Sequence, residues 1–393
     1  MIGTPARGDK FWDREKELAQ IWKTLETSSV LLVAPRRFGK TSIMLKIMDK
    51  PEPGWKTIYL DTEWIEGPGD FIVELITRVA EKGLLEKVWE GIQRIVGGAV
   101  SRIETVGIAE FKISLREKMG KDWRDKGREL LKTLKSMDDR LILITDELPI
   151  LIHRINRISK KADEFLFWLR GVRLMPELLD KVRWIIGGSI GMRKVLKDVG
   201  VGTEVINDLH IINIREYPIE AAREHIRVLL KNEGNFEDVP DRLVEKFLKI
   251  IEVPIPFFIQ ILVREALNKM EQQGKGELSE EIIEKAYEDG VLAPYNRTYF
   301  DHYYERLEKY YGEEEARISK RLLMEVARKG EVAKSEFFKI FQMETKGKGT
   351  EETLSDLLTE LENDFYIVLN KERDVYRFST KVLRDWWLRF HTF

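Results

Sequence analysis

Apolar runs and amphipathic stretches alternate over the first 215 residues of the chain. Five short runs rich in Val, Ile and Leu are typical of strands buried on both faces of a parallel sheet, and they cover residues 30–33, 57–61, 140–147, 181–189 and 209–214. The stretches between them repeat apolar residues at helical spacing, and Asp13 is the expected N-cap of the first helix. Strands that alternate with helices predict an α/β fold, a parallel sheet with helices on both faces.

Residues 84–139 interrupt this alternation, and we interpret them as a probable insertion. Trp89–Ile95 is expected to be helical. Residues 103–115 alternate loosely, which favours a β-hairpin, and residues 122–135 return to helical periodicity.

The pattern changes after Tyr217-Pro218, where strands stop and four helices are expected over 219–231, 240–251, 257–270 and 279–287. A tyrosine-rich stretch, 295–311, predicts a connecting helix. Three helices and a hairpin follow, over 315–329, 333–342, 350–363, 365–369 and 375–378, which is the element order of a winged helix. We therefore expect an α/β domain at 1–215, a helical lid at 216–294, and a linker helix with a winged-helix domain at 295–393.

Composition narrows the class of protein. The 393 residues carry a net charge of −2, so no global charge favours nucleic acid or an acidic partner. Charged residues make up 34% and cysteine is absent, which fits a heat-adapted (thermophile) protein and excludes disulfides and thiolate metal sites. No signal peptide and no apolar run of about 18 residues are present, so we expect a soluble, cytoplasmic protein without membrane contact.

The most informative stretch follows the first predicted strand. Gly39-Lys40-Thr41 stands between that strand and a helix, which is the context of a phosphate-binding loop. Lys40 would reach the β- and γ-phosphates and the Thr41 hydroxyl would bind Mg²⁺. The usual pattern begins with glycine, and here Ala34 holds that place; the expected nucleotide contacts are Ala34, Pro35, Arg36, Arg37, Phe38, Gly39, Lys40, Thr41 and Ser42.

Two acids end the strand at 140–147. Asp146 would hold Mg²⁺ and Glu147 would orient or deprotonate the attacking water, although such a pair can also simply cap the next helix. Ser189, after Gly187-Gly188, stands where a polar group can touch the γ-phosphate or the water. The catalytic candidates are therefore Lys40, Glu147 and Ser189, and the metal candidates are Thr41 and Asp146.

With these residues in place, the chain resembles the archaeal ATPase family, a STAND/MNS-type clade of AAA+-related P-loop ATPases close to the origin-recognition and Cdc6 branch. The resemblance covers nearly the whole chain except 84–139, and the segments that carry it are 11–18, 34–41, 144–147, 187–189, 254–258 and 383–387. It implies ATP/ADP and Mg²⁺ as ligands. It also implies that Phe11, Asp13, Arg14 and Pro256 lie on the base side of the nucleotide.

Two functions remain open at this stage. The first is a Mg²⁺-dependent ATPase that works as a nucleotide-driven switch, with double-stranded DNA as a candidate partner for its winged helix. The alternative is a nucleotide-gated binding or signalling module with little hydrolysis that engages a protein partner, because residues 315–393 carry 15 Lys/Arg and 14 Asp/Glu and so lack a basic footprint. A homo-oligomer is possible under either, with Arg170, Arg173 and Arg193 as candidate arginine fingers. The tyrosines of 295–311 either stack on bases or belong to a core.

Overall fold

The computed structural model describes residues 3–8, 11–82, 93, 107–120, 122–188, 191–274 and 277–391. The chain divides into two compact units, Pro5–Ile214 and Arg215–Phe393, the latter together with Met1–Thr4, and each is described by itself. Within the described residues, no helix combines the length and the apolar character needed to cross a membrane.

The first unit is built on five parallel strands in the order β2-β3-β4-β1-β5. The strands are β1 (Ser29–Val33), β2 (Trp55–Asp61), β3 (Arg140–Asp146), β4 (Val182–Gly188) and β5 (Leu209–Asn213). Their β-branched and leucine side chains are buried almost throughout in β3 and β4, the central strands. The α/β fold class and all five strands predicted from the sequence are confirmed.

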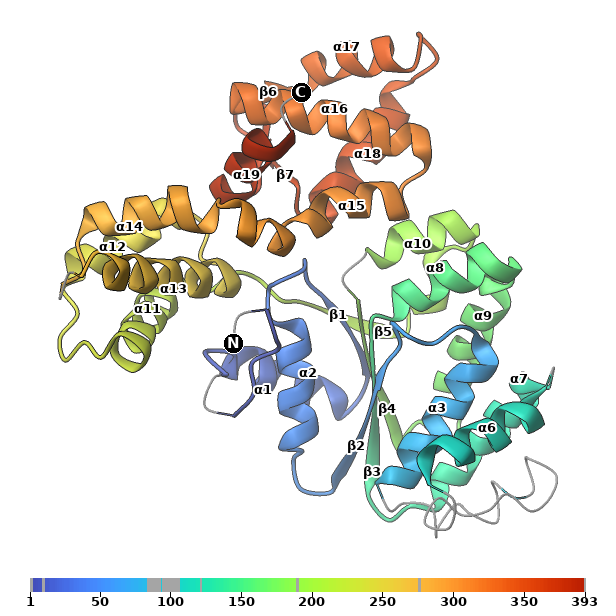
Figure 1. The fold of residues 1–393 in the computed structure, drawn as a ribbon. Coiled ribbons are helices and arrows are strands. Elements are labelled where there is room, and N and C mark those ends of the chain that lie inside the picture. The colour runs from blue at the N-terminus through green and yellow to red at the C-terminus, as the bar shows by residue number, and fades with distance from the viewer. Residues whose placement is uncertain are drawn as a thin grey trace. The chain divides into compact units, whose positions relative to one another are not determined.

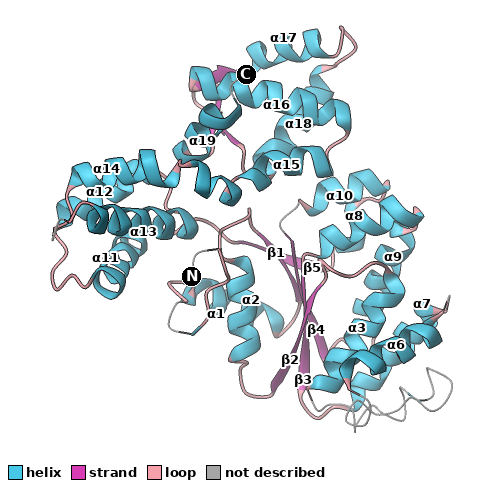
Figure 2. Ribbon diagram, viewed as in Figure 1, coloured by secondary structure: helices cyan, strands magenta, loops and turns pink. Residues whose placement is uncertain are grey.

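Helices cover both faces of this sheet (Figures 1 and 2). One face carries α1 (Glu15–Leu25) and α2 (Lys40–Asp49), and the other carries α3 (Pro68–Glu81), α8 (Leu148–Ser159) and α9 (Ala162–Arg173). Three further α-helices lie in the described part of this unit, namely α6 (Ile108–Met119), α7 (Trp123–Thr133) and α10 (Met192–Val199). Since the strands are parallel, the loops that follow β1, β2, β3 and β4 all leave the sheet at one edge.

Two local predictions in this unit are wrong. The first helix begins at Glu15, and its N-cap position is Arg14 rather than Asp13. The hairpin expected over 103–115 does not form in its described part, because residues 108–115 belong to α6. Phe111, Leu115 and Met119 recur every four residues and are buried on the side that contacts α3, so helical periodicity decides this segment. The helix expected at 89–95 lies outside the described residues, apart from Gln93.

The second unit begins with four helices, α11 (Ile219–Gly234), α12 (Asp241–Ile251), α13 (Pro256–Gln272) and α14 (Glu280–Ala286), followed by a π-helical turn at Tyr287–Val291 and a 3₁₀ helix at Pro294–Tyr299. It continues with α15 (Asp301–Tyr310), α16 (Glu313–Lys329), β6 (Glu331–Ala333), α17 (Lys334–Glu344), α18 (Glu351–Asn363), β7 (Ile367–Asn370), β8 (Val375–Phe378) and α19 (Lys381–His391). The expected hairpin β7–β8 is present. The sequence missed β6, which adds a third antiparallel strand in the order β6-β8-β7.

Four of the aromatic side chains in the tyrosine-rich stretch 295–311 are buried in the core of this unit. Phe300, Tyr303, Tyr310 and Tyr311 are all buried. Because a buried ring offers no free face to a base, the base-stacking interpretation is wrong for these four residues, and they belong to the core instead.

Candidate functional site

The loop between β1 and α2 turns sharply just before the helix. Arg37 and Gly39 adopt positive φ angles of 75° and 90°, whereas the φ angle of Ala34 is not positive. Alanine at position 34 therefore costs no backbone strain here, because the left-handed positions lie further along the loop. Lys40 follows this turn directly and is the first residue of α2.

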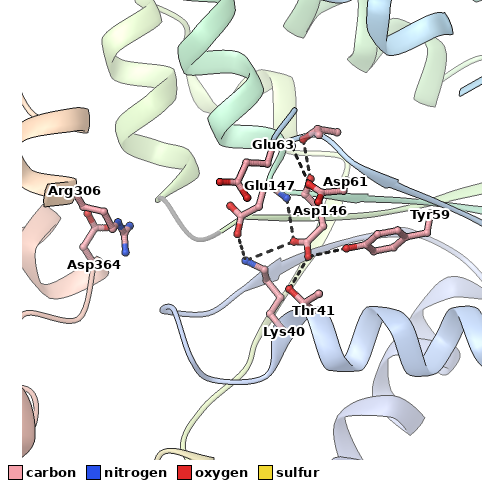
Figure 3. Close-up of polar contacts among 10 residues, drawn as sticks. Lys40, Thr41, Tyr59, Asp61, Glu63, Asp146, Glu147, Arg306 and Asp364 are labelled. Carbon is pink, nitrogen blue, oxygen red and sulfur yellow. Dashed lines mark hydrogen bonds and ion pairs between the residues drawn. The ribbon is translucent and has the colours of Figure 1, made fainter. Parts of the chain in front are cut away.

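Lys40 and Thr41 meet the end of β3 (Figure 3). The Lys40 Nζ lies 3.8 Å from Asp146 Oδ1 and 3.7 Å from Glu147 Oε1. The Thr41 hydroxyl donates to Asp146 Oδ2 at 2.6 Å. Lys40 and Asp146 are both buried. The cluster of one ammonium, one hydroxyl and two carboxylates is assembled from two segments that lie more than a hundred residues apart in the sequence.

Glu147 has an unusual backbone. Its φ and ψ are 57° and 30°, in the left-handed region, and its N–H donates to its neighbour Asp146 at 3.0 Å. The residue occupies the N-cap position of α8, so its side chain leaves the sheet at the same edge as Lys40. A non-glycine residue in this conformation is typical of functional sites, where the surroundings hold it in place.

The sequence did not predict the contribution of β2. The Tyr59 hydroxyl donates to Asp146 Oδ2 at 3.3 Å, and Asp61 is aligned with Asp146 in the sheet. Burial raises the pKa of the Asp61 carboxyl, and the carboxylates of Asp146 and Glu147 raise it further. The sequence did show an acidic residue, Asp61, at the end of a predicted strand. Only the strand order of the structure shows that this strand lies beside β3.

The glycines that end β4 make room for this group. A Cβ on Gly187 would lie 3.1 Å from Lys40 Cδ and 2.3 Å from Met44 Cε. A Cβ on Gly188 would lie 2.3 Å from the ring of Pro149. A side chain at position 188 would therefore collide with the first turn of α8, and one at position 187 would require Met44 and the lysine stem to shift.

The start of α1 supports the loop. Arg14 is buried, and one of its guanidinium nitrogens donates to the Phe38 carbonyl at 3.0 Å while another pairs with Glu17 at 2.7 Å. Phe11 lies under the ammonium of Lys46, 5.0 Å from the ring centre. Arg14 therefore binds the backbone of the loop between β1 and α2, a contact that the sequence did not predict.

No protein-family model matches the chain, and no curated protein matches it. Among solved structures, the Walker-type ATPase Paby2304 of Pyrococcus abyssi is similar over 98% of both chains, with a TM-score of 0.64 and 17% identity. The ORC2 protein of Aeropyrum pernix is similar over 99% of this chain and 96% of its own, with a TM-score of 0.57 and 11% identity. The chain therefore shares the P-loop ATPase fold of these structures. The resemblance drawn from the sequence is confirmed at that level.

In this P-loop fold, the structure brings some of the expected site residues together and leaves others elsewhere. Lys40, Thr41, Asp146 and Glu147 form one cluster. Ser189 lies outside the described residues. Pro256 begins α13 in the second unit, where it is buried. Ser42 is buried in α2 and accepts a hydrogen bond from the Ala6 N–H.

The candidate arginine fingers also differ from one another. Arg173 is buried and makes two hydrogen bonds to the Asp208 carboxylate, at 2.8 and 2.9 Å, so in this structure it ties α9 to the segment before β5. Arg193 is exposed on α10. Of the candidate arginine fingers, Arg173 therefore has a structural role in this unit, whereas Arg193 lies on the surface.

Proposed function

We propose that this chain binds ATP with Mg²⁺ and hydrolyses it. The observation that carries the proposal is the meeting of the Lys40-Thr41 pair with Asp146 and Glu147, in which the Thr41 hydroxyl lies 2.6 Å from the Asp146 carboxylate. Hydrolysis of a phosphoanhydride depends mainly on positioning and on charge stabilisation, and this cluster supplies groups for both.

The phosphate chain would lie over the start of α2. Backbone N–H groups of the loop and the helix N-terminus favour an anion there, and Lys40 supplies a positive charge. The stem of Lys40 passes close to Gly187, so its ammonium is held at the sheet edge beside the two acids. In this proposal Ala34 to Ser42 surround the phosphates, and Arg14 supports the loop through the Phe38 carbonyl in place of a contact with the base.

The donor set fits Mg²⁺. A hydroxyl oxygen and a carboxylate oxygen 2.6 Å apart are hard oxygen ligands, and Mg²⁺ is usually held by one or two protein groups together with substrate phosphates. Thr41 and Asp146 would hold the ion, which when bound neutralises charge on the phosphates. Glu147 would orient the attacking water, with Ser189 as a further polar candidate near the γ-phosphate.

The resemblance and the fold support an adenine nucleotide. The Aeropyrum pernix ORC2 protein was solved as ADPNP–ADP complexes, and this chain shares its fold. Phe11 and Asp13 lie before α1, and we place them on the base side of the bound nucleotide.

Two substitutions test the proposal. Lys40→Ala is expected to abolish ATP binding, and Glu147→Gln is expected to keep ATP binding while turnover falls by at least a hundredfold. Isothermal titration with ATP and Mg²⁺ measures the first effect, and steady-state phosphate release measures the second. Turnover that survives both changes would refute the proposal. Tight ATP binding with negligible turnover in the wild type would favour the nucleotide-gated module instead.

For the output of the switch, we propose that the helices and three-stranded sheet of 313–378 form a winged helix that binds a protein partner. Its basic residues are partly neutralised, since Arg373 pairs with Glu331 at 2.7 Å, and the near-equal charge count of 315–393 gives no footprint for DNA. Salt-dependent binding to duplex DNA, lost on reversal of Lys371 and Arg373, would overturn this choice of partner.

A further inference from the structure

We propose that Thr62 and Tyr59, at the end of strand β2, are positioning residues that hold the Asp146–Glu147 pair in its working orientation. The inference rests on the proposed function, because it concerns the same acidic pair. Neither residue belongs to a recognisable motif in the sequence, and both act through Asp146 rather than on the nucleotide.

Thr62 holds the peptide that joins the two acids. Its side chain is fully buried, and both its hydroxyl and its N–H donate to the Asp146 carbonyl, at 2.7 and 3.0 Å. On the other side of the same peptide, the Glu147 N–H donates to the Asp146 carboxylate at 3.0 Å. The plane of this peptide is therefore fixed at both its oxygen and its nitrogen.

That restraint matters because of the backbone of Glu147. A left-handed φ of 57° is strained in a non-glycine residue, so it persists only where neighbouring contacts hold it. The two hydrogen bonds from Thr62 are contacts of that kind. Without them the peptide is held only at its nitrogen, and the Glu147 side chain is less firmly kept at the edge where it meets Lys40.

Tyr59 acts on the carboxylate itself. Tyr59 and Asp61 point to the same face of β2, and Asp61 is aligned with Asp146, so the Tyr59 hydroxyl reaches Asp146 Oδ2 at 3.3 Å. The same oxygen accepts the shorter bond from Thr41.

The main experiment separates the Thr62 hydroxyl from its methyl group. Thr62→Val keeps the shape and removes the hydroxyl, and Thr62→Ser keeps the hydroxyl and removes the methyl. Thr57→Val is the matched control, since Thr57 is a buried threonine within β2 whose hydroxyl donates to a backbone carbonyl, that of Met48 rather than that of Asp146. All three variants are expected to lose some stability, so a purely structural role would lower their turnover alike.

We expect kcat of Thr62→Val to fall about fivefold to tenfold, the worth of one buried hydrogen bond, with KM for ATP unchanged. Thr62→Ser and Thr57→Val should keep kcat within twofold of the wild type. Equal kcat values for Thr62→Val and Thr57→Val, or a loss in Thr62→Ser as large as that in Thr62→Val, would overturn the role of Thr62.

Tyr59→Phe tests the second residue through the metal. The Mg²⁺ concentration at half-maximal turnover should rise about threefold, since the weaker of the two bonds to Asp146 Oδ2 is lost, while the affinity for ATP without Mg²⁺ stays unchanged. An unchanged Mg²⁺ midpoint would remove Tyr59 from the proposal. If Glu147→Gln retains wild-type turnover, the proposed function fails. If Glu147→Gln loses turnover but Thr62→Val and Tyr59→Phe behave like the wild type, this inference alone fails.

Discussion

Replacing Gly188 with alanine should lower the rate of catalysis, because the new methyl group would collide with the first turn of α8. The new Cβ would lie 2.3 Å from Pro149 Cδ and 2.5 Å from Pro149 Cγ. Carbon atoms that are not bonded prefer about 3.5–4.0 Å, so one of the two segments must move by roughly 1 Å. The proline ring is rigid, which leaves the backbone of β4 or of α8 to give way.

Glu147 stands two residues before Pro149, so a shift of that turn displaces its carboxylate. Misplacement of a reacting group by about 1 Å can cost on the order of a hundredfold in rate, and overpacking of this kind costs typically 1–3 kcal/mol of stability. We therefore expect kcat for ATP hydrolysis to fall by one to two orders of magnitude, with a smaller change in ATP affinity because Lys40 faces the neighbouring Gly187.

The assay combines steady-state phosphate release, ATP titration and urea unfolding. Gly171→Ala is the control, because Gly171 is exposed in α9 and a Cβ there meets nothing within 4 Å. That variant should gain about 0.5–1 kcal/mol of stability at unchanged turnover. Wild-type kcat together with wild-type stability in Gly188→Ala would refute the idea that the contact between Gly188 and Pro149 sets the position of Glu147.

Three further outcomes are expected. Gly187→Ala should weaken ATP binding about tenfold in calorimetric titration, because its Cβ crowds Met44 and the stem of Lys40; an unchanged affinity would contradict that contact. Trp386→Ala should cost about 3–5 kcal/mol in urea unfolding, as the side chain is fully buried, and a loss below about 1 kcal/mol would show that it is not part of the core. Burial lowers the pKa of His225 from 6.5 to about 4, so the unfolded chain binds the extra proton and stability should fall on the order of 3 kcal/mol as the pH drops from 6.5 to 4. His225→Gln should flatten that slope, and an identical pH profile would contradict it.

The sequence predicted those parts of the structure in which local pattern decides the outcome. The five strands of the sheet were found because buried parallel strands are continuous apolar runs. By contrast, β6 has only three residues and draws its support from β8, a partner more than forty residues away, so no local signal marks it. The segment of α6 was misjudged because its apolar residues alternate loosely, and its contact with α3 settles the periodicity.

The same division applies to the candidate site. Lys40 and Thr41 stand side by side in a motif, as do Asp146 and Glu147, so the sequence could name them. Thr62 could not be named in this way, because its role depends on β2 lying beside β3, 84 residues along the chain. The engagement of Arg14 with the Phe38 carbonyl and the left-handed backbone of Glu147 are likewise products of packing, and propensity alone gives no sign of either.

The second unit constrains how a nucleotide signal would travel through it. Phe258 of α13 stacks on Phe300, which stacks in turn on Trp386 of α19, with 6.0 Å between ring centres in both pairs. The Tyr287 hydroxyl also donates to Asp385 of α19 at 2.8 Å. The helices of 219–291 and the last helix of the chain therefore share one core. A packed core of this kind does not deform continuously, so any displacement of α13 would carry α19 with it, and the expected lid and the expected winged helix would move as one lever rather than as two hinged parts.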